Sequence, residues 1–208
     1  MKNLKIALTK GRLEKKTLEL FTRIGMDCSE LTGGSRKLIY QIPAYNLEIL
    51  LAKANDVITY VEHGVCDLGV VGKDTILESG RAFYEMLDLG FGKCKFSVAV
   101  RDGDDFYGTY KNRRVATKYP NVAKSYFQRR GIDVDIIKIE GSVELAPLLG
   151  IADAIVDLVE TGATLRENGL SVIEDITDIS ARLIVNIASM KMKKSEIDRL
   201  ISEMEAKV

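Results

Sequence analysis

The feature that most constrains the fold is an internal repeat, in which residues 56–68 and 142–154 follow the same order of residue types. Each copy starts with a residue that can cap a helix, runs through a helical pattern to a glycine, and reaches an aspartate before an apolar run. The two aspartates, Asp67 and Asp153, lie 86 positions apart. A repeat of this length predicts two similar lobes, each with a small α/β sheet. The alternative is that any strand–helix–strand unit uses a cap, a glycine and an acid in this way.

Both ends of the repeated helix carry a residue with a clear backbone role. The side-chain oxygens of Asp56 and Ser142 can accept a hydrogen bond from a backbone N–H that lacks a helical partner, so both are expected to be N-caps. Gly64 and Gly150 can adopt the left-handed conformation that ends a helix before the next strand begins.

Short apolar runs alternate with helical patterns along the whole chain. This alternation predicts an α/β fold with mostly parallel strand pairing. The expected strands cover residues 4–8, 38–42, 47–52, 68–71, 95–100, 114–117, 134–139 and 154–159. The expected helices cover residues 13–24, 56–63, 122–130, 143–149 and 193–205.

Two long extended stretches, residues 84–100 and 171–188, are expected to cross between the lobes. The first lobe then comprises residues 1–90 and 181–208, and the second comprises residues 91–180. Because α/β sheets bind ligands at the carboxyl ends of their strands, a cleft between the lobes is the expected ligand site.

Composition excludes several classes of function. The 208 residues carry 30 basic and 30 acidic side chains, so no broad basic field is available for a nucleic acid. No run of about 18 apolar residues is present, and we expect no membrane span. Cys28, Cys66 and Cys94 form no CxxC pair and are expected to be reduced thiols of a cytoplasmic protein. The single histidine, His63, rules out a His-rich metal site, and we expect it to have a structural or solvent-exposed role.

The sharpest candidate site is a turn that follows the strand expected at residues 154–159. Asp157 lies near the carboxyl end of this strand, where it can accept hydrogen bonds from ribose hydroxyls. The following residues Thr161, Gly162, Ala163 and Thr164 are small, so their backbone N–H groups can converge on a phosphate. A helix that starts here would add positive potential. The alternative is an ordinary strand-to-helix turn in which one of the threonines is an N-cap.

A second candidate is the basic turn after the first strand. Lys10 and Arg12 flank Gly11, and the planar guanidinium of arginine suits phosphate oxygens. Arg36, which follows a flexible glycine-rich stretch, is a weaker candidate of the same kind. The alternatives are a solvated basic turn and an exposed loop arginine.

Two acidic residues complete the set of candidates. Asp74, in the first-lobe counterpart of the phosphate turn, can meet a hydroxyl or amino group of a ligand, or it can cap the next helix. Glu140, at the end of a strand, can hold ribose hydroxyls or a metal-bound water, or it can be a plain capping residue. The sequence leaves both pairs of alternatives open.

With these residues assembled, the chain resembles the ATP phosphoribosyltransferase family, the first enzymes of histidine biosynthesis, in its short form. One departure is Thr9, where the family commonly has proline. The matching stretches are spread over most of the chain and keep the family's order, and they cover residues 8–12, 35–37, 67–74, 141–147 and 152–165.

The resemblance implies a two-lobed fold like that of type II periplasmic binding proteins. It also implies that Asp157 and residues 161–164 bind phosphoribosyl pyrophosphate, with Mg²⁺ on the pyrophosphate. We expect Glu140 to contact the same substrate, and Gly11 and Asp74 to contact ATP. The groups expected to stabilise the leaving pyrophosphate, and so to be catalytic, are Lys10, Arg12 and Arg36.

The same resemblance carries expectations about partners. Short forms work with a separate regulatory subunit that is similar to histidyl-tRNA synthetase, so we expect a hetero-oligomer with a homodimer of this chain as a unit. Longer members carry a third, regulatory domain, and we expect this chain to lack it. Two rival hypotheses remain open: a non-catalytic two-lobed module that binds a small molecule or senses an effector, and a phosphoribosyltransferase that acts on a different base.

Overall fold

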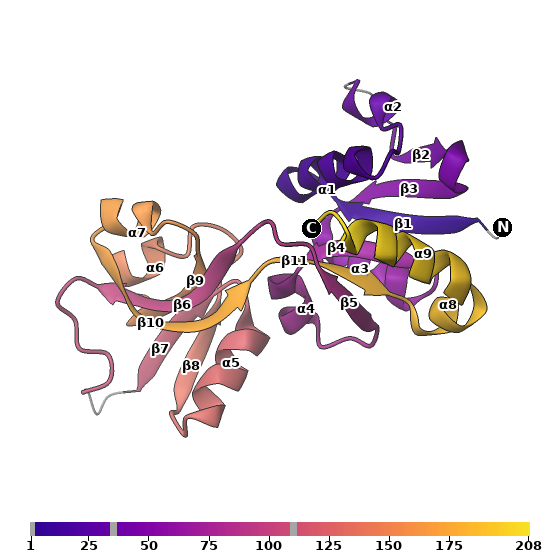
Figure 1. Cartoon of the computed structure of the whole chain (residues 1–208). Helices are drawn as coiled ribbons and strands as arrows, with labels where there is room; N and C mark the ends of the chain where they lie inside the picture. The colour runs from indigo at the N-terminus through magenta and orange to yellow at the C-terminus, as the bar shows by residue number, and fades with distance from the viewer. Residues whose placement is uncertain (1–2, 34–36, 109–111) are drawn as a thin grey trace. The chain divides into compact units, whose positions relative to one another are not determined.

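The computed structural model describes residues 3–33, 37–108 and 112–208. The chain divides into two units, each built around its own sheet (Figure 1). Unit 1 comprises Met1–Gly92 and Ser180–Val208, and unit 2 comprises Lys93–Ile179.

The sheet of unit 1 has the strand order β2-β3-β1-β4-β11-β5. Its central strand β1 pairs in parallel with β3 and β4, whereas β2, β11 and β5 join by antiparallel pairing. The carboxyl ends of three neighbouring strands therefore lie at one edge of this sheet. The strands are β1 (Leu4–Thr9), β2 (Ile39–Ile42), β3 (Leu47–Ala52), β4 (Leu68–Gly72), β5 (Tyr84–Asp88) and β11 (Ala181–Val185).

Helices cover both faces of the unit 1 sheet. α1 (Arg12–Arg23) buries Leu18 and Phe21, which are three positions apart and so lie on the same side of the helix. α1 and α9 (Lys194–Glu205) pack on one face, and α3 (Ala54–Glu62) and α4 (Lys73–Ser79) pack on the other. The remaining short elements are α2 (Ser29–Thr32), a 3-10 turn (Pro43–Tyr45) and α8 (Ile187–Met192).

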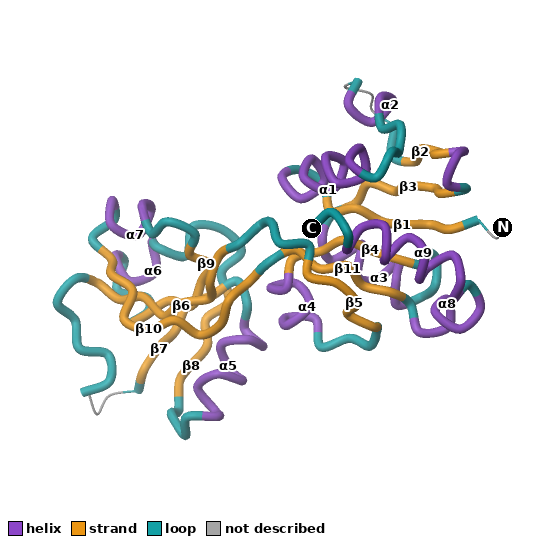
Figure 2. Tube along the Cα trace, viewed as in Figure 1, coloured by secondary structure: helices purple, strands orange, loops and turns teal. Residues whose placement is uncertain are grey.

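The strands of unit 2, drawn in orange in Figure 2, form a second sheet with the order β10-β6-β9-β7-β8. β7 pairs in parallel with β8 and β9, and β6 pairs antiparallel with β9 and β10. α5 packs on one face, and α6 and α7 pack on the other. The elements are β6 (Cys94–Arg101), β7 (Arg113–Thr117), α5 (Pro120–Arg129), β8 (Val134–Lys138), α6 (Leu145–Leu148), β9 (Ala154–Val159), α7 (Ala163–Glu167) and β10 (Leu170–Ile179).

The two copies of the predicted repeat make the same pair of hydrogen bonds to a neighbouring strand. In unit 1, Asp67 Oδ2 accepts from the Lys5 N–H at 2.9 Å, while the Asp67 N–H donates to the Lys5 carbonyl at 2.8 Å. In unit 2, Asp153 Oδ2 accepts from the Arg114 N–H at 2.8 Å, and the Asp153 N–H donates to the Arg114 carbonyl at 2.8 Å. Each aspartate thus ties the beginning of its own strand to the beginning of the neighbouring parallel strand, which explains why both copies of the repeat place an aspartate before an apolar strand.

The glycines of the repeat have the predicted conformation, but the predicted caps are wrong. Gly64 and Gly150 have φ values of 68° and 70°, in the left-handed region that favours glycine. The N-cap of α3 is Lys53, so Asp56 lies inside the first helical turn.

The second repeated helix is also shorter than predicted. α6 is a single turn whose N-cap is Glu144, so Ser142 lies outside the helix. Pro147 has no backbone N–H to donate, which fits the short length of this turn.

The prediction of mostly parallel pairing is also wrong. Residues 84–100 and 171–188 do not each form one long extended element. Each contributes one strand to each sheet: β5 and β6 from the first stretch, and β10 and β11 from the second. These four strands enter their sheets by antiparallel pairing.

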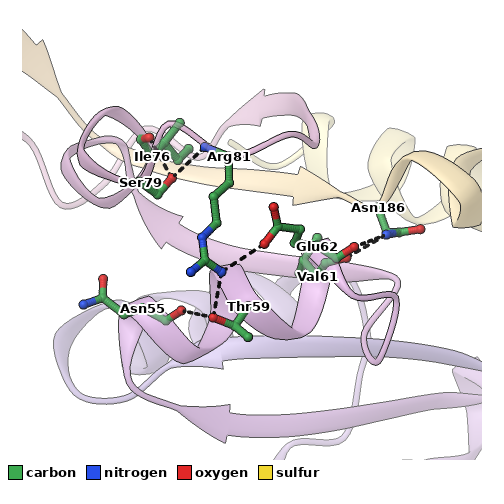
Figure 3. Close-up of polar contacts among 8 residues, drawn as sticks. All are labelled: Asn55, Thr59, Val61, Glu62, Ile76, Ser79, Arg81 and Asn186. Carbon is green, nitrogen blue, oxygen red and sulfur yellow. Dashed lines mark hydrogen bonds and ion pairs between the residues drawn. The ribbon is translucent and has the colours of Figure 1, made fainter. Parts of the chain in front are cut away.

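The carboxyl end of α3 is fixed by polar contacts from two sides (Figure 3). Asn186 Nδ2 donates to the carbonyls of Val61 at 2.7 Å and Glu62 at 3.2 Å, and Asn186 Oδ1 caps α8 by accepting from the Ser189 N–H. Arg81 Nη1 donates to the carboxylate of Glu62 at 2.9 Å. The last carbonyls of α3 are therefore satisfied by a side chain from the distant segment that begins α8.

Other predictions from composition concern single residues. His63 is exposed at the C-cap of α3, in agreement with a structural or solvent role. Cys28 and Cys66 are buried free thiols, and Cys94 is half-buried. Within the described part of the chain, no helix is both long and apolar enough to cross a membrane.

Candidate functional site

The site in unit 2 is built at the carboxyl edge of three parallel strands. β8, β7 and β9 lie side by side and run in the same direction, so the residues that follow them meet at one edge of the sheet. Lys118 follows β7, Glu140 lies two residues after β8, and the turn of residues 160–162 follows β9. Loops at this edge are the usual ligand-binding elements of such sheets.

The turn itself, residues 160–164, is exposed except for Gly162, which is half-buried. Gly162 has φ 71° and is the N-cap of α7, so glycine is required at this position for conformational reasons. The Thr161 hydroxyl oxygen accepts from the Ala163 N–H at 3.3 Å. Among the described residues, no acceptor contacts the N–H groups of Gly162 and Thr164. Two backbone donors of the predicted phosphate turn are therefore available to a ligand.

Two details of this turn differ from the sequence interpretation. Neither threonine is the N-cap, because Gly162 occupies that position. α7 is only five residues long, so the aligned peptide dipoles add little potential, and an anion would be bound by individual N–H groups and hydroxyls.

Asp157 lies on β9 directly beside Ser97 of β6, on the face of the sheet covered by α6 and α7. The pKa of Asp157 is raised to about 6, mainly by burial and in smaller part by the nearby Glu144 carboxylate, while the Leu158 N–H and Lys118 act in the opposite direction. A carboxylate that is half-removed from water accepts hydrogen bonds from a ligand's hydroxyl groups at little further desolvation cost. Asp157 is thus suited to hold a polyhydroxylated ligand.

Glu140 is exposed to solvent, in contrast to the half-buried Asp157. It forms an ion pair with Lys138 at 2.7 Å, and the hydrogen bond from Lys138 lowers the pKa of its carboxyl group. β8 lies at the end of the sheet order, with β7 between it and β9. The acidic side chain that acts on Asp157 is instead Glu144, four residues further along the chain.

A hollow on unit 2 borders the turn on one side. The side of the hollow nearest the turn is formed by Thr161, Gly162 and Arg166. Asp175 also lines the hollow, and it accepts from Lys95 Nζ at 2.6 Å and from Ser97 Oγ at 2.8 Å. The turn thus has open space beside it.

The candidate residues of unit 1 lie at the corresponding edge of its sheet, where β3, β1 and β4 end. Lys10, Gly11 and Arg12 follow β1, and all three are exposed. Gly11 has φ 98°, and its N–H donates to Glu14 Oε2 at 3.1 Å. An anion at this amide would therefore have to displace the Glu14 carboxylate.

Asp74 follows β4 at the same edge of the unit 1 sheet. It lies in the first turn of α4, whose N-cap is Gly72, and no side-chain hydrogen bond caps this helix. Its Oδ1 lies so close to Gly72 that a Cβ there would clash at 2.0 Å. Glycine is therefore needed at position 72 to let this carboxylate fold back. Arg36, the remaining candidate, lies outside the described residues.

The sequence interpretation missed several residues that the structure places at these edges. Lys118 and Glu144 both act electrostatically on Asp157, and Lys53 follows β3 at the edge that carries the basic turn. Lys118 and Lys53 could have been found because each directly follows a predicted strand. Glu144 could have been found because it precedes a short helix. Arg166 of α7 contacts the turn of residues 160–164 through the Thr161 carbonyl, which no sequence pattern indicated.

Comparison with known proteins adds an independent line of evidence. Residues 53–206 match a family model described as ATP phosphoribosyltransferase. The chain is 59% identical over 207 residues to the ATP phosphoribosyltransferase of Clostridium kluyveri, covering 100% of this chain and 94% of the relative. It is 57% identical to the enzyme of the same name from Clostridium botulinum, covering 98% and 97%.

Solved structures of similar proteins agree with this match. The ATP phosphoribosyl transferase (HisG:HisZ) complex from Thermotoga maritima contains a chain with 30% identity and a TM-score of 0.84, covering 98% of this chain and 97% of that one. The periplasmic aliphatic sulphonate binding protein SsuA from Escherichia coli has 14% identity and a TM-score of 0.59, covering 98% and 72%. The second match shows that the two-unit fold is shared with periplasmic binding proteins.

Proposed function

Because the chain belongs to the ATP phosphoribosyltransferase family, we propose that it joins ATP to phosphoribosyl pyrophosphate and releases pyrophosphate, as the first step of histidine biosynthesis. The observation that supports the proposal most directly is the edge of unit 2. There a half-buried carboxylate, Asp157, precedes a turn whose Gly162 and Thr164 amides lack protein acceptors. A carboxylate for ribose hydroxyls beside amides for a phosphate matches the two ends of a ribose 5-phosphate.

The residues of unit 2 bind and orient the sugar phosphate in this proposal. The amides of Gly162 and Thr164 and the hydroxyls of Thr161 and Thr164 hold the 5-phosphate, together with the backbone at Ala163. Asp157 accepts from the ribose hydroxyls, and Glu140 is assigned to the same substrate. Ionised carboxylate acceptors bind hydroxyl groups more strongly than neutral acceptors do.

The chemical step requires charge stabilisation more than proton transfer. N1 of the adenine ring uses its own lone pair to form a bond to the anomeric carbon, while the bond from that carbon to the pyrophosphate oxygen breaks. The pyrophosphate leaves with the bonding electrons, and the configuration at the carbon inverts. Since a neutral ring nitrogen needs no general base, catalysis rests on positioning and on stabilising the leaving group.

For unit 1 we propose that Lys10, Arg12 and Arg36 supply positive charge to the pyrophosphate, and that Gly11 and Asp74 contact ATP. The exposure of Lys10 and Arg12 at the carboxyl edge of their sheet supports this assignment. Guanidinium groups present two parallel donors to phosphate oxygens, which suits the multiply charged pyrophosphate leaving group.

We also propose that the reaction uses Mg²⁺, which supplies positive charge to the phosphate oxygens when it is bound. In the described ranges, no three His, Cys, Asp or Glu side chains are grouped so that they could hold a metal ion. Proteins usually bind Mg²⁺ through substrate phosphates and only one or two carboxylates, so a cluster of protein ligands is not required. Asp157 and its neighbour Glu144 are two carboxylates of unit 2 that would be available to the ion.

The partner follows from the solved relative. Since that structure is a HisG:HisZ complex, we propose that this chain assembles with a HisZ-type regulatory subunit similar to histidyl-tRNA synthetase, with a homodimer of this chain as a unit. Buried free thiols at Cys28 and Cys66 support a reducing, cytoplasmic setting.

The decisive experiment measures pyrophosphate release from ATP and phosphoribosyl pyrophosphate with Mg²⁺, with and without the regulatory subunit. We expect pyrophosphate release to depend on both substrates. No pyrophosphate should be released when a free nucleobase replaces ATP. Release with a different base instead of ATP would identify another phosphoribosyltransferase. Binding of an amino acid or small anion without any release would identify a non-catalytic binding module.

A further inference from the structure

Arg166 returns from α7 to the turn that precedes its own helix. Its Nη1 donates to the Thr161 carbonyl at 3.0 Å. A Cβ added at Gly162 would lie 3.0 Å from the same nitrogen, so the guanidinium lies against the Thr161–Gly162 peptide. Arg166 is exposed and also lines the hollow beside the turn.

This contact fixes the direction of one backbone donor. In a planar trans peptide, the carbonyl oxygen and the N–H group point in opposite directions. Because the Thr161 carbonyl is held toward Arg166, the Gly162 N–H of the same peptide points away from the guanidinium. No described residue accepts a hydrogen bond from that N–H.

The contact matters because this peptide precedes a glycine. Glycine populates positive and negative φ values about equally, so a peptide next to it can rotate at small cost. Gly162 lies at φ 71° in the structure. By binding the Thr161 carbonyl, the Arg166 side chain therefore favours one orientation of the Thr161–Gly162 peptide over the others that the backbone could adopt.

We propose that Arg166 is a positioning residue, which holds the Thr161–Gly162 peptide so that the Gly162 N–H is directed to the 5-phosphate of phosphoribosyl pyrophosphate. This inference rests on the proposed function of the turn. It assigns to α7 a role in substrate binding in addition to its packing through Leu165.

The test compares three variants of the full chain in the presence of its regulatory subunit. Arg166→Met keeps the length of the side chain but removes its donors and charge, whereas Arg166→Lys keeps a donor and the charge. The matched control is Arg129→Met, since Arg129 is an exposed arginine of the same unit that also donates to a backbone carbonyl, that of Ser125. Binding of ribose 5-phosphate and of inorganic pyrophosphate is measured by titration calorimetry, together with kcat and KM for each substrate.

Arg166→Met is expected to weaken ribose 5-phosphate binding and raise KM for phosphoribosyl pyrophosphate by about tenfold, the effect of losing one well-directed hydrogen bond to a charged group. KM for ATP and binding of pyrophosphate stay within about twofold of the unmodified chain, Arg166→Lys recovers most of the loss, and Arg129→Met has no effect. An equal loss of affinity for ribose 5-phosphate and pyrophosphate would show a merely structural role and overturn the inference.

Two further variants separate this inference from the proposed function. Asp157→Asn and Thr164→Val alter groups assigned to the sugar phosphate itself. If both weaken ribose 5-phosphate binding while Arg166→Met does not, the role of Arg166 is wrong and the site stands. If all three leave binding unchanged, the proposed site is itself wrong, and the inference falls with it.

Discussion

Asp67 and Lys193 are 126 positions apart in the sequence, yet Lys193 Nζ donates to Asp67 Oδ2 at 2.7 Å. The Asp67 side chain is only 5% exposed, and it also accepts from Ser189 Oγ at 2.6 Å and from the Lys5 N–H at 2.9 Å. One carboxylate therefore joins the beginning of β1, the beginning of β4 and the α8–α9 segment.

Removing the lysine is predicted to destabilise unit 1. Lys193→Met leaves a buried carboxylate without its counter-charge, and breaking such a pair typically costs about 3–5 kcal/mol. Because Ser189 and the Lys5 N–H still donate to Asp67, we expect a loss of about 2–3 kcal/mol in the free energy of unfolding, measured by urea denaturation.

The neighbouring lysine is the matched control for this variant. Lys194 forms an exposed ion pair with Asp198 on the same helix, four residues away. Lys194→Met is expected to change the free energy of unfolding by about 0.5 kcal/mol or less. Similar losses for the two variants would refute the special role of the Asp67–Lys193 pair.

Gly69 is predicted to be required for packing, not for backbone conformation. A Cβ at this position would lie 2.8 Å from methyl carbons of both Val57 and Val61, so α3 would have to move away from β4. Gly69→Ala is expected to lower the free energy of unfolding by about 1–3 kcal/mol. Gly141→Ala is the control, because a Cβ there meets nothing within 4 Å. Unchanged stability of Gly69→Ala would mean that the α3–β4 contact is looser than the structure indicates.

The sequence predicted those strands and helices that can be recognised from the residues within and next to them. The strands expected at residues 47–52 and 154–159 have the observed bounds, because their apolar runs are bordered by residues that end strands. α8 was missed, since residues 187–192 follow a β-like stretch without a strong helical period. Its N-cap Asn186, whose side chain accepts from the Ser189 N–H, was a readable signal.

Pairing direction and electrostatic environment could not be predicted in the same way. β6 and β10 are adjacent in the sheet although about 70 residues separate them in sequence, and only the tertiary fold shows that they are antiparallel. The position of Asp157 at a strand end was visible in the sequence, whereas its burial and the nearness of Glu144 were not. The caps were misassigned because the observed N-caps, Lys53 and Glu144, make no side-chain capping hydrogen bond, so no capping side chain marks these helix starts in the sequence.

Arg12 is predicted to act in the chemical step. If its guanidinium stabilises the departing pyrophosphate, Arg12→Ala lowers kcat by roughly ten to a thousandfold, the scale of losing one such donor. Arg23→Ala is the control, because Arg23 is an exposed arginine at the other end of the same helix. Steady-state turnover of ATP and phosphoribosyl pyrophosphate measures both variants. Near-normal turnover of Arg12→Ala would reject the catalytic assignment.

The ionised Asp157 side chain, which we assign to ligand binding, is predicted to lower the free energy of unfolding. The size of this effect depends on pH. Its pKa is about 6 in the folded chain against an ordinary value of 3.8, so the folded state holds the proton more tightly than the unfolded state does. The contribution of this group to stability is therefore fully present below pH 3.8 and is lost as the pH rises to about 6.

Asp157→Asn removes this ionisation and should therefore make the chain more stable at neutral pH. A shift of about two pKa units corresponds to about 2–3 kcal/mol, so the variant is expected to gain up to this amount at pH 8 and almost nothing at pH 4. Urea denaturation at both pH values measures the difference, and ribose 5-phosphate binding should weaken in the same variant because an amide cannot replace a charged acceptor. A gain in stability that is equal at pH 4 and pH 8 would show that repacking, and not ionisation, causes it.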